Sequence, residues 1–160
     1  MNSFLTLSEL IGCKIEAIRC HYIEENEYGQ QMFFSYLKLS NGFVISIPMF
    51  DEENFLELSD TNLQYLQKEF ITGDEFSKPL KNLMLGTTIE DLFFCYFNNR
   101  IVGDERAYIK LNNNHYLTEI NFGPPGVAIG LTLLNKQEFI ENIKNCEQEI
   151  KSYLGLKGNR

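Results

Sequence analysis

Residues 12–22, GCKIEAIRCHY, and residues 86–96, GTTIEDLFFCY, share glycine, isoleucine, glutamate and tyrosine at the same spacings. With the next residue of each included, four of 12 positions are identical. A second pair of blocks follows in the same order. YLKLSNGFV begins at Tyr36 and YIKLNNNHY begins at Tyr108, with four identities in nine positions. Chance matching of short blocks is the alternative, but their common order and spacing indicate an internal duplication.

Three segments of the first half are rich in apolar, β-branched and aromatic residues and alternate enough to be predicted as strands. They are residues 14–23, 31–39 and 43–48. Asn41 and Gly42 separate the second from the third, and an Asn-Gly pair supplies the positive φ angles of a tight hairpin turn. The first half is therefore predicted to begin with a three-stranded meander.

The second half repeats this pattern. Residues 88–97 are predicted as its first strand, and the three asparagines at 112–114 occupy the place of the hairpin turn, where Asn tolerates the left-handed region second only to Gly. Residues 54–58 and 127–134 can each add one more strand after the meanders. Both halves are thus expected to be mainly antiparallel sheet.

A helix is predicted after each meander. Residues 135–154 place apolar side chains at alternating spacings of four and three, with Asn135 as the N-cap and Gly155 as the stop. A weaker helical pattern covers residues 61–71 and is followed by Gly73.

The fold class that follows is α+β, with two tandem β-meander-plus-helix repeats. The first repeat is assigned to residues 1–75 and the second to residues 76–160. Because a lone three-stranded sheet buries too little apolar surface, we expect the two repeats to pack as one compact domain with pseudo-twofold symmetry.

Composition favours a globular protein of reducing surroundings. The chain has 160 residues, of which 44% are hydrophobic, with 13 Phe and 8 Tyr, so a sizeable core can form. Its four cysteines are scattered without a Cys-x-x-Cys pair and are predicted to be reduced thiols. A signal peptide and a long apolar run are both missing from the sequence, and we therefore expect a cytoplasmic protein.

Charge divides unevenly between the two halves. Residues 1–75 carry 13 acidic and 4 basic side chains, a net charge of −9, whereas residues 76–160 carry 9 acidic and 10 basic ones, a net charge of +1. Phosphates attract clusters of Lys and Arg, which this chain lacks. The balance therefore argues against a nucleic-acid partner and against an anionic membrane surface.

Catalytic, metal and cofactor motifs are not recognisable in the sequence. Cys20 and His21 are neighbours on a predicted strand, so their side chains point to opposite faces and cannot form a Cys-His pair. The only other histidine, His115, follows the asparagine turn and is expected to be exposed, without metal-ligand spacing around it. Glu16 and Glu90, the acids common to both copies, leave a carboxylate enzyme open, although pairing with Lys14 is an alternative role.

The clearest difference between the copies is a group of acids in the first half. In an up-down-up meander, the loop after the first strand and the end of the third lie at the same edge of the sheet. Three carboxylates follow each of these points, and aromatic residues flank them. The predicted partner-binding residues are Glu24, Glu25, Glu27, Tyr28, Phe50, Asp51, Glu52, Glu53 and Phe55. A solvated, solubilising rim and a calcium site are the alternatives to a docking surface for a basic protein.

In size, charge and architecture the chain resembles the immunity proteins of bacterial polymorphic or contact-dependent toxin systems. The resemblance extends over the whole chain but includes no diagnostic motif. It implies a non-enzymatic protein that binds no cofactor or metal and neutralises a basic toxin domain, such as a nuclease, by covering its cationic groove. An oligomeric scaffold is a further alternative, since exposed meander edges can pair between two copies in a homodimer.

Overall fold

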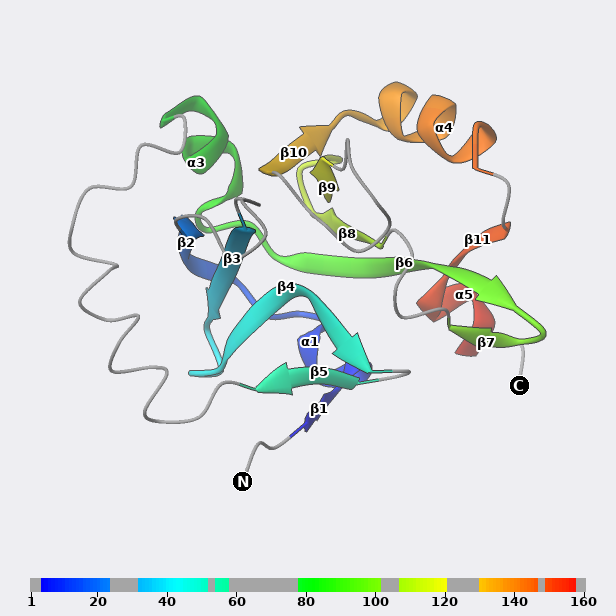
Figure 1. The fold of residues 1–160 in the computed structure, drawn as a ribbon, viewed down its shortest axis with the longest axis horizontal. Coiled ribbons are helices and arrows are strands. Elements are labelled where there is room, and N and C mark those ends of the chain that lie inside the picture. The colour runs from blue at the N-terminus through cyan, green and yellow to red at the C-terminus, as the bar shows by residue number, and fades with distance from the viewer. Residues whose placement is uncertain are drawn as a thin grey trace.

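The computed structural model describes residues 4–23, 32–51, 54–57, 78–101, 107–120, 130–146 and 149–157. Over these residues the chain forms two mostly antiparallel sheets and several short helices, which confirms the predicted α+β class (Figure 1). The predicted helix at 61–71, the turn at 123–126 and the boundary between residues 75 and 76 lie outside the described residues.

The first sheet contains five strands in the order β1-β5-β4-β3-β2. Its elements are β1 (Phe4–Thr6), α1 (Leu7–Leu10), β2 (Ile15–Ile23), β3 (Met32–Leu39), β4 (Val44–Asp51) and β5 (Asn54–Glu57). The meander of β2, β3 and β4 and the added strand β5 agree with the predicted segments. The N-terminal strand β1, which pairs antiparallel with β5, was not predicted.

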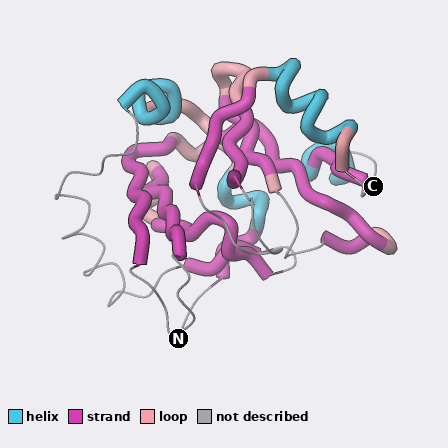
Figure 2. Tube along the Cα trace, turned by 45° about the horizontal axis from the view of Figure 1, so that its top comes forward, coloured by secondary structure: helices cyan, strands magenta, loops and turns pink. Residues whose placement is uncertain are grey.

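The second sheet has six strands in the order β10-β9-β8-β6-β11, with β7 also paired to β6. Its strands are β6 (Ile89–Phe97), β7 (Arg100–Ile101), β8 (Tyr108–Leu111), β9 (Tyr116–Ile120), β10 (Gly130–Leu134) and β11 (Glu149–Ser152). Its helices are α3 (Lys78–Met84), α4 (Lys136–Lys144) and α5 (Tyr153–Lys157). In Figure 2, helices α3 and α4 lie at the periphery of the molecule, to the left and right of the strands.

The helix predicted over 135–154 is correct at its start and wrong at its end. Asn135 is the N-cap in a capping box, accepting from the backbone N–H of Glu138 at 2.9 Å while its own N–H donates to the Glu138 carboxylate at 2.7 Å. The helix ends at Lys144. The backbone N–H groups of Asn145 and Cys146 donate to the carbonyls three residues earlier, at 3.3 and 3.2 Å, and so close the last turn. The chain then pairs with β6 as strand β11, because the open edge of β6 offers a full ladder of backbone partners.

The two halves meet where the segment before β2 crosses the segment before β6, through a single antiparallel bridge between Lys14 and Thr88. Four backbone hydrogen bonds surround this bridge in two reciprocal pairs. Gly12 N–H donates to the Ile89 carbonyl and Gly86 N–H to the Ile15 carbonyl, both at 2.8 Å. The N–H of Ile15 donates to the Thr87 carbonyl and that of Ile89 to the Cys13 carbonyl, both at 2.9 Å. This arrangement is called the crossing below.

Glycine at the start of each crossing segment has a backbone reason. Gly12 has φ of 86° and Gly86 has φ of 79°, the left-handed region that L side chains rarely adopt. Each of the two follows a short helix, α1 or α3, so each ends a helix in the way that C-terminal glycines commonly do. The glycine that opens both repeated sequence blocks is therefore required by the local backbone.

One large core joins the two halves. It includes fully buried residues of the first half, such as Leu10 and Ile15, together with Met84, Ile89 and Leu92 of the second. A smaller aromatic core lies where α4 packs on the second sheet, with the rings of Tyr116 and Phe139 stacked at 3.9 Å between centroids. Strand β6 contributes Phe94 to the first core and Phe93 to the second, so its two faces are both covered.

Candidate functional site

Most of the predicted partner-binding residues lie outside the part of the chain that the structure describes. These are Glu24, Glu25, Glu27, Tyr28, Glu52 and Glu53. For Phe50, Asp51 and Phe55 the structure describes the backbone, in which Phe50 pairs with Phe55 and Asp51 with Asn54 at the ends of β4 and β5. The acidic rim therefore stays a prediction.

The backbone that leads to the predicted rim is more bent than a plain meander. Strand β4 follows β3 only as far as the pair Ser35 and Ile47. Its last residues pair with β5 instead, and Figure 1 shows β4 as a curved ribbon whose tip turns away from β3. Strand β2, in contrast, stays paired with β3 up to Ile23. The position of Asp51 is thus set by β5 and not by the β2–β3 hairpin.

Glu16 and Glu90 lie at equivalent irregularities of the two sheets. The register of β2 on β3 shifts between Ile15 and Ala17, and that of β6 on β8 shifts between Ile89 and Asp91. Each glutamate is thus the extra residue of a β-bulge, and both are exposed. The two acids belong to different sheets, so the register gives no sign of a shared carboxylate pair.

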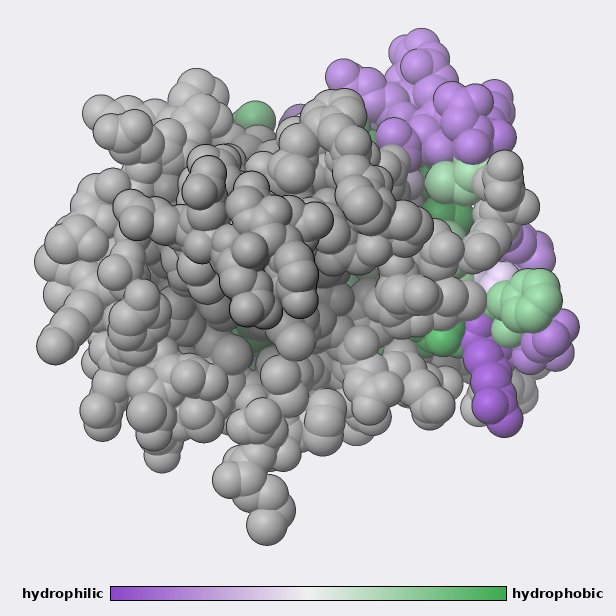
Figure 3. Space-filling model, in the orientation of Figure 1, coloured by the Kyte–Doolittle hydropathy of each residue, from purple (hydrophilic) through white to green (hydrophobic). Residues whose placement is uncertain are grey.

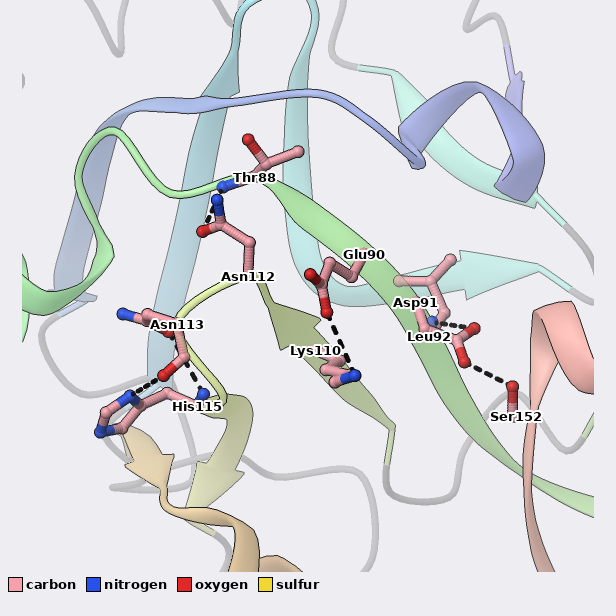
Figure 4. Close-up of polar contacts among 9 residues, drawn as sticks. All are labelled: Thr88, Glu90, Asp91, Leu92, Lys110, Asn112, Asn113, His115 and Ser152. Carbon is pink, nitrogen blue, oxygen red and sulfur yellow. Dashed lines mark hydrogen bonds and ion pairs between the residues drawn. The ribbon is translucent and has the colours of Figure 1, made fainter.

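The Glu90 side chain forms an ion pair across the strands with Lys110 at 3.1 Å (Figure 4). The hydrogen bond that the Lys110 ammonium donates to the Glu90 carboxylate is the main cause that raises the pKa of Lys110. Both groups are partly exposed, at 27% for Lys110 and 42% for Glu90, so water screens the pair and limits its contribution. The partner of Glu90 is therefore Lys110 on the neighbouring strand, and the suggested pairing with Lys14 is not what the structure contains.

Asp91 carries the most connected carboxylate of the described residues, and the sequence reasoning missed it. Its Oδ1 accepts from the backbone N–H of Leu92 at 2.8 Å, while Oδ2 accepts from the hydroxyl of Ser152 (Figure 4). Oδ1 also accepts from the backbone N–H of Leu154 at 3.1 Å. The hydroxyl of Ser152 accepts from Gly155 N–H at 3.0 Å in turn. Asp91 thus fastens the start of α5 to β6. An aspartate near the start of an apolar strand was the available signal.

The asparagine turn between β8 and β9 is fixed by its own side chains. Asn112 Oδ1 accepts from Thr88 N–H at 3.1 Å (Figure 4). Asn113 Nδ2 donates to the Leu83 carbonyl at 2.8 Å. The imidazole Nδ1 of His115 lies 3.1 Å from the Asn113 carbonyl, and the residue is half-buried. His115 is therefore less exposed than expected, because it folds back on the turn that precedes it.

The cysteine side chains that the structure describes are free thiols. Cys13 and Cys95 are buried, and Cys146 is half-buried. Burial raises the pKa of the Cys13 thiol, whose Sγ donates to the Glu9 carbonyl at 3.2 Å. A protonated, buried thiol is a poor nucleophile. The backbone of Cys20 and His21 occupies consecutive positions of the regular β2–β3 ladder.

The hairpin of β6 and β7 presents the most exposed large apolar side chain of the described residues. Phe97 is 66% exposed and pairs with Arg100 across a two-residue turn of Asn98 and Asn99, which have φ of 51° and 61°. At that end of the molecule Figure 3 shows a hydrophobic group bordered by hydrophilic ones. In the sequence, Asn98 and Asn99 follow β6 as Glu24 and Glu25 follow β2. The tip of the second half therefore carries amides where the first half has carboxylates.

The described residues contain neither a metal-binding cluster nor a membrane-spanning helix. Among them, His, Cys, Asp and Glu side chains do not gather in any group of three that could hold a metal ion. Their helices are all too short or too polar to cross a bilayer. Comparison of the chain with protein-family models, with curated proteins and with solved structures finds no match in any of the three.

Proposed function

We propose that the chain consists of two copies of one sheet-and-helix unit, related by a pseudo-twofold axis through the Lys14–Thr88 bridge. The reciprocal bonds of the crossing support this, because each bond of one half has its counterpart in the other. The matched bulges at Glu16 and Glu90 support it independently. A duplicated unit explains why each bulge lies the same number of residues after the glycine of its crossing segment.

We further propose that this protein is a non-enzymatic binding module whose acidic first half docks on a basic protein. The observation that carries the proposal is the charge division, −9 in residues 1–75 against +1 in residues 76–160, in a chain whose halves share one core. Opposite charge steers encounter and selects the partner, whereas burial of the shared core supplies the rigid support.

The class of partner that fits is a toxin domain with a cationic substrate groove, such as a nuclease, and the chain would act as its immunity protein in the bacterial cytoplasm. The acidic rim would cover the groove, with Tyr28, Phe50 and Phe55 as aromatic anchors. Tight binding would then suffice to neutralise the toxin.

The roles of the described carboxylates favour binding over catalysis. General acid–base chemistry needs a carboxyl group free to reach a substrate proton. Glu90 is already paired with Lys110, and Asp91 already accepts from a hydroxyl and two backbone N–H groups. These two acids stabilise the second sheet, so the carboxylates left for an external partner are mainly those of the first half.

The test is a pull-down with the full-length chain from its source organism, followed by binding of the captured basic protein to a charge-reversed variant. Replacing Glu24, Glu25, Asp51 and Glu52 by Lys should abolish binding while the circular dichroism spectrum and melting temperature stay close to those of the parent. A matched control reverses Glu141 and Glu149, two exposed acids of the second half, and should bind as the parent does.

Raised salt should weaken binding of the parent. At ~0.1 M ionic strength, salt already screens the attraction between exposed charges that lie more than about 10 Å apart. Equal affinity of the parent and the four-site variant would exclude the acidic rim as the docking surface. Capture of a second copy of the chain alone would favour the oligomeric scaffold instead.

A further inference from the structure

The hairpin turns of the two halves have the same backbone but different chemistry. In the first half the turn lies between β3 and β4, and Gly42 has φ of 89°. In the second half the turn lies between β8 and β9, and Asn114 occupies the same place with φ of 62°. The N–H of Gly42 donates to the Leu39 carbonyl at 2.9 Å, and that of Asn114 to the carbonyl of Leu111 at 3.1 Å. Asn41 does not share the positive φ that the sequence suggested for it.

The residue before each of these positions is an asparagine, Asn41 or Asn113. Both side chains accept a backbone N–H two residues later at 3.2 Å through Oδ1. They differ at Nδ2, the nitrogen that leaves when an asparagine deamidates. Asn113 Nδ2 is held by the Leu83 carbonyl at 2.8 Å, whereas no hydrogen bond from Asn41 Nδ2 to any of the described residues is present. Asn41 is exposed and Asn113 is half-buried.

The following residue makes the second difference. A Cβ atom placed on Gly42 would meet nothing within 4 Å, so the space on that side of its Cα is open. Its N–H donates to the Leu39 carbonyl, as that of Asn114 donates to the Leu111 carbonyl, so this bond does not distinguish the two turns. Glycine samples more backbone conformations than any other residue, whereas the side chain of Asn114 restricts its backbone. Residues 41 and 42 are the only Asn-Gly pair in the chain.

From these differences we propose that Asn41 is a site of spontaneous deamidation and that its counterpart Asn113 is protected. The Gly42 backbone nitrogen, after losing its proton to hydroxide, forms a bond to Cγ of Asn41. The Nδ2 group takes a proton from water, which regenerates hydroxide, and leaves as ammonia when the bond from Cγ to Nδ2 breaks. A five-membered succinimide remains. Water then opens this ring at either carbonyl and gives aspartate or isoaspartate. Asparagine is among the thermolabile residue types for this reason.

The modification would reach the crossing of the two halves. Ser40, the neighbour of Asn41, donates its N–H to the Lys14 carbonyl and accepts the Lys14 N–H through Oγ, both at 2.9 Å. Isoaspartate inserts one extra methylene into the backbone at residue 41, so the turn can no longer keep its present hydrogen bonds. Each conversion also adds one negative charge to the half that is already acidic.

The experiment is incubation of the full-length protein at 37 °C at neutral and at mildly alkaline pH, with peptide mapping by mass spectrometry and an isoaspartate assay at intervals. Asn41 should convert at least about fivefold faster than Asn113. This factor corresponds to ~1 kcal/mol, which is the approximate free-energy difference that the greater backbone freedom of glycine represents. The rate should rise with pH, because the attacking nitrogen must first be deprotonated. Absence of conversion at Asn41, or equal rates at the two sites, would overturn the proposal.

Two exchanges between the turns sharpen the test. The Gly42→Asn variant gives the first turn the residue of the second, and asparagine tolerates the left-handed region. Conversion at Asn41 should therefore slow by at least about fivefold. The Asn114→Gly variant should speed conversion at Asn113, but by less than the full difference, because Nδ2 stays bound to Leu83. Unchanged rates in both variants would contradict the assigned cause, and the parent comparison does not depend on either variant folding.

Discussion

The two crossing segments, residues 12–15 and 86–89, have the same backbone but serve halves with different surfaces. Both begin with a left-handed glycine, exchange the same hydrogen bonds and end at a fully buried isoleucine. Beyond them the first half is strongly acidic and the second is nearly neutral. The difference teaches that a shared local backbone constrains a few buried and left-handed positions, while the exposed positions around it can differ in charge.

The largest effect is expected from the isoleucines of the crossing. Ile15→Ala and Ile89→Ala should each lower the free energy of unfolding by ~2–5 kcal/mol, because both side chains are fully buried in the shared core. Chemical denaturation followed by circular dichroism measures the loss. As a control, Ile143→Ala should cost less, since Ile143 is only half-buried. A large loss at one crossing isoleucine and none at the other would break the equivalence of the two segments.

A smaller loss is expected where the halves differ. Asp91 fastens α5 to β6, and the residue at the same bulge of the first half is Ala17. Asp91→Ala should cost ~1–3 kcal/mol, because it leaves partly buried donors unpaired. Hydrogen exchange should also quicken at residues 149–157 relative to β8. Protection unchanged in that segment would mean that Asp91 does not hold it.

The crossing glycines should behave alike. An alanine at either position must adopt a left-handed φ, which costs ~1–2 kcal/mol, and a Cβ there meets nothing within 4 Å, so the cost is conformational alone. Gly12→Ala and Gly86→Ala should therefore lower the melting temperature by similar amounts. Gly155→Ala carries no left-handed φ, but its Cβ would lie 3.3 Å from Ser152 Oγ, so a loss there would report that contact and not the backbone conformation. Unequal losses at the two crossing glycines would count against the shared geometry.

The smallest effect is expected from the Glu90–Lys110 pair. Replacing Lys110 by Met should change stability at pH 7 by less than ~1 kcal/mol, because the pair is partly exposed. The pKa of Lys110 is raised in the folded state, so its contribution is complete below the ordinary lysine value of 10.5 and is lost as pH rises through the raised value. The parent should thus lose slightly more stability than the variant above that pH. Identical alkaline profiles would show that the pair contributes nothing.

Local features of the fold were predictable because neighbouring residues decide them. The strands, the hairpin turns and the N-cap at Asn135 follow from alternation, from residues that tolerate positive φ and from a capping box. The helical spacing beyond residue 144 misled, because Ile143 and Ile150 do contribute to the same apolar core but from a helix and from a strand. Apolar residues spaced three and four apart thus indicate which side chains are buried, but they do not show whether the backbone there is helix or strand.

The candidate site was less predictable than the fold. The list of acids followed from the sequence, but their placement was inferred from a regular meander, and β4 leaves β3 after Ile47 to pair with β5. The anchoring role of Asp91 was missed because its partners, Ser152 and Leu154, lie more than 60 residues away in the chain. Contacts of that separation leave no periodic trace along the sequence.

The amino-acid sequence alone determined that this chain is α+β, that two short blocks recur in the same order in its two halves and that only the first half is strongly acidic. Tertiary structure decided that α4 ends at Lys144, that β11 completes the edge of β6 and that the halves meet at the crossing. The physical reason is range. Propensity and charge are properties of neighbouring residues, whereas a free strand edge or a buried backbone group is satisfied by whichever distant segment the packed core brings to it.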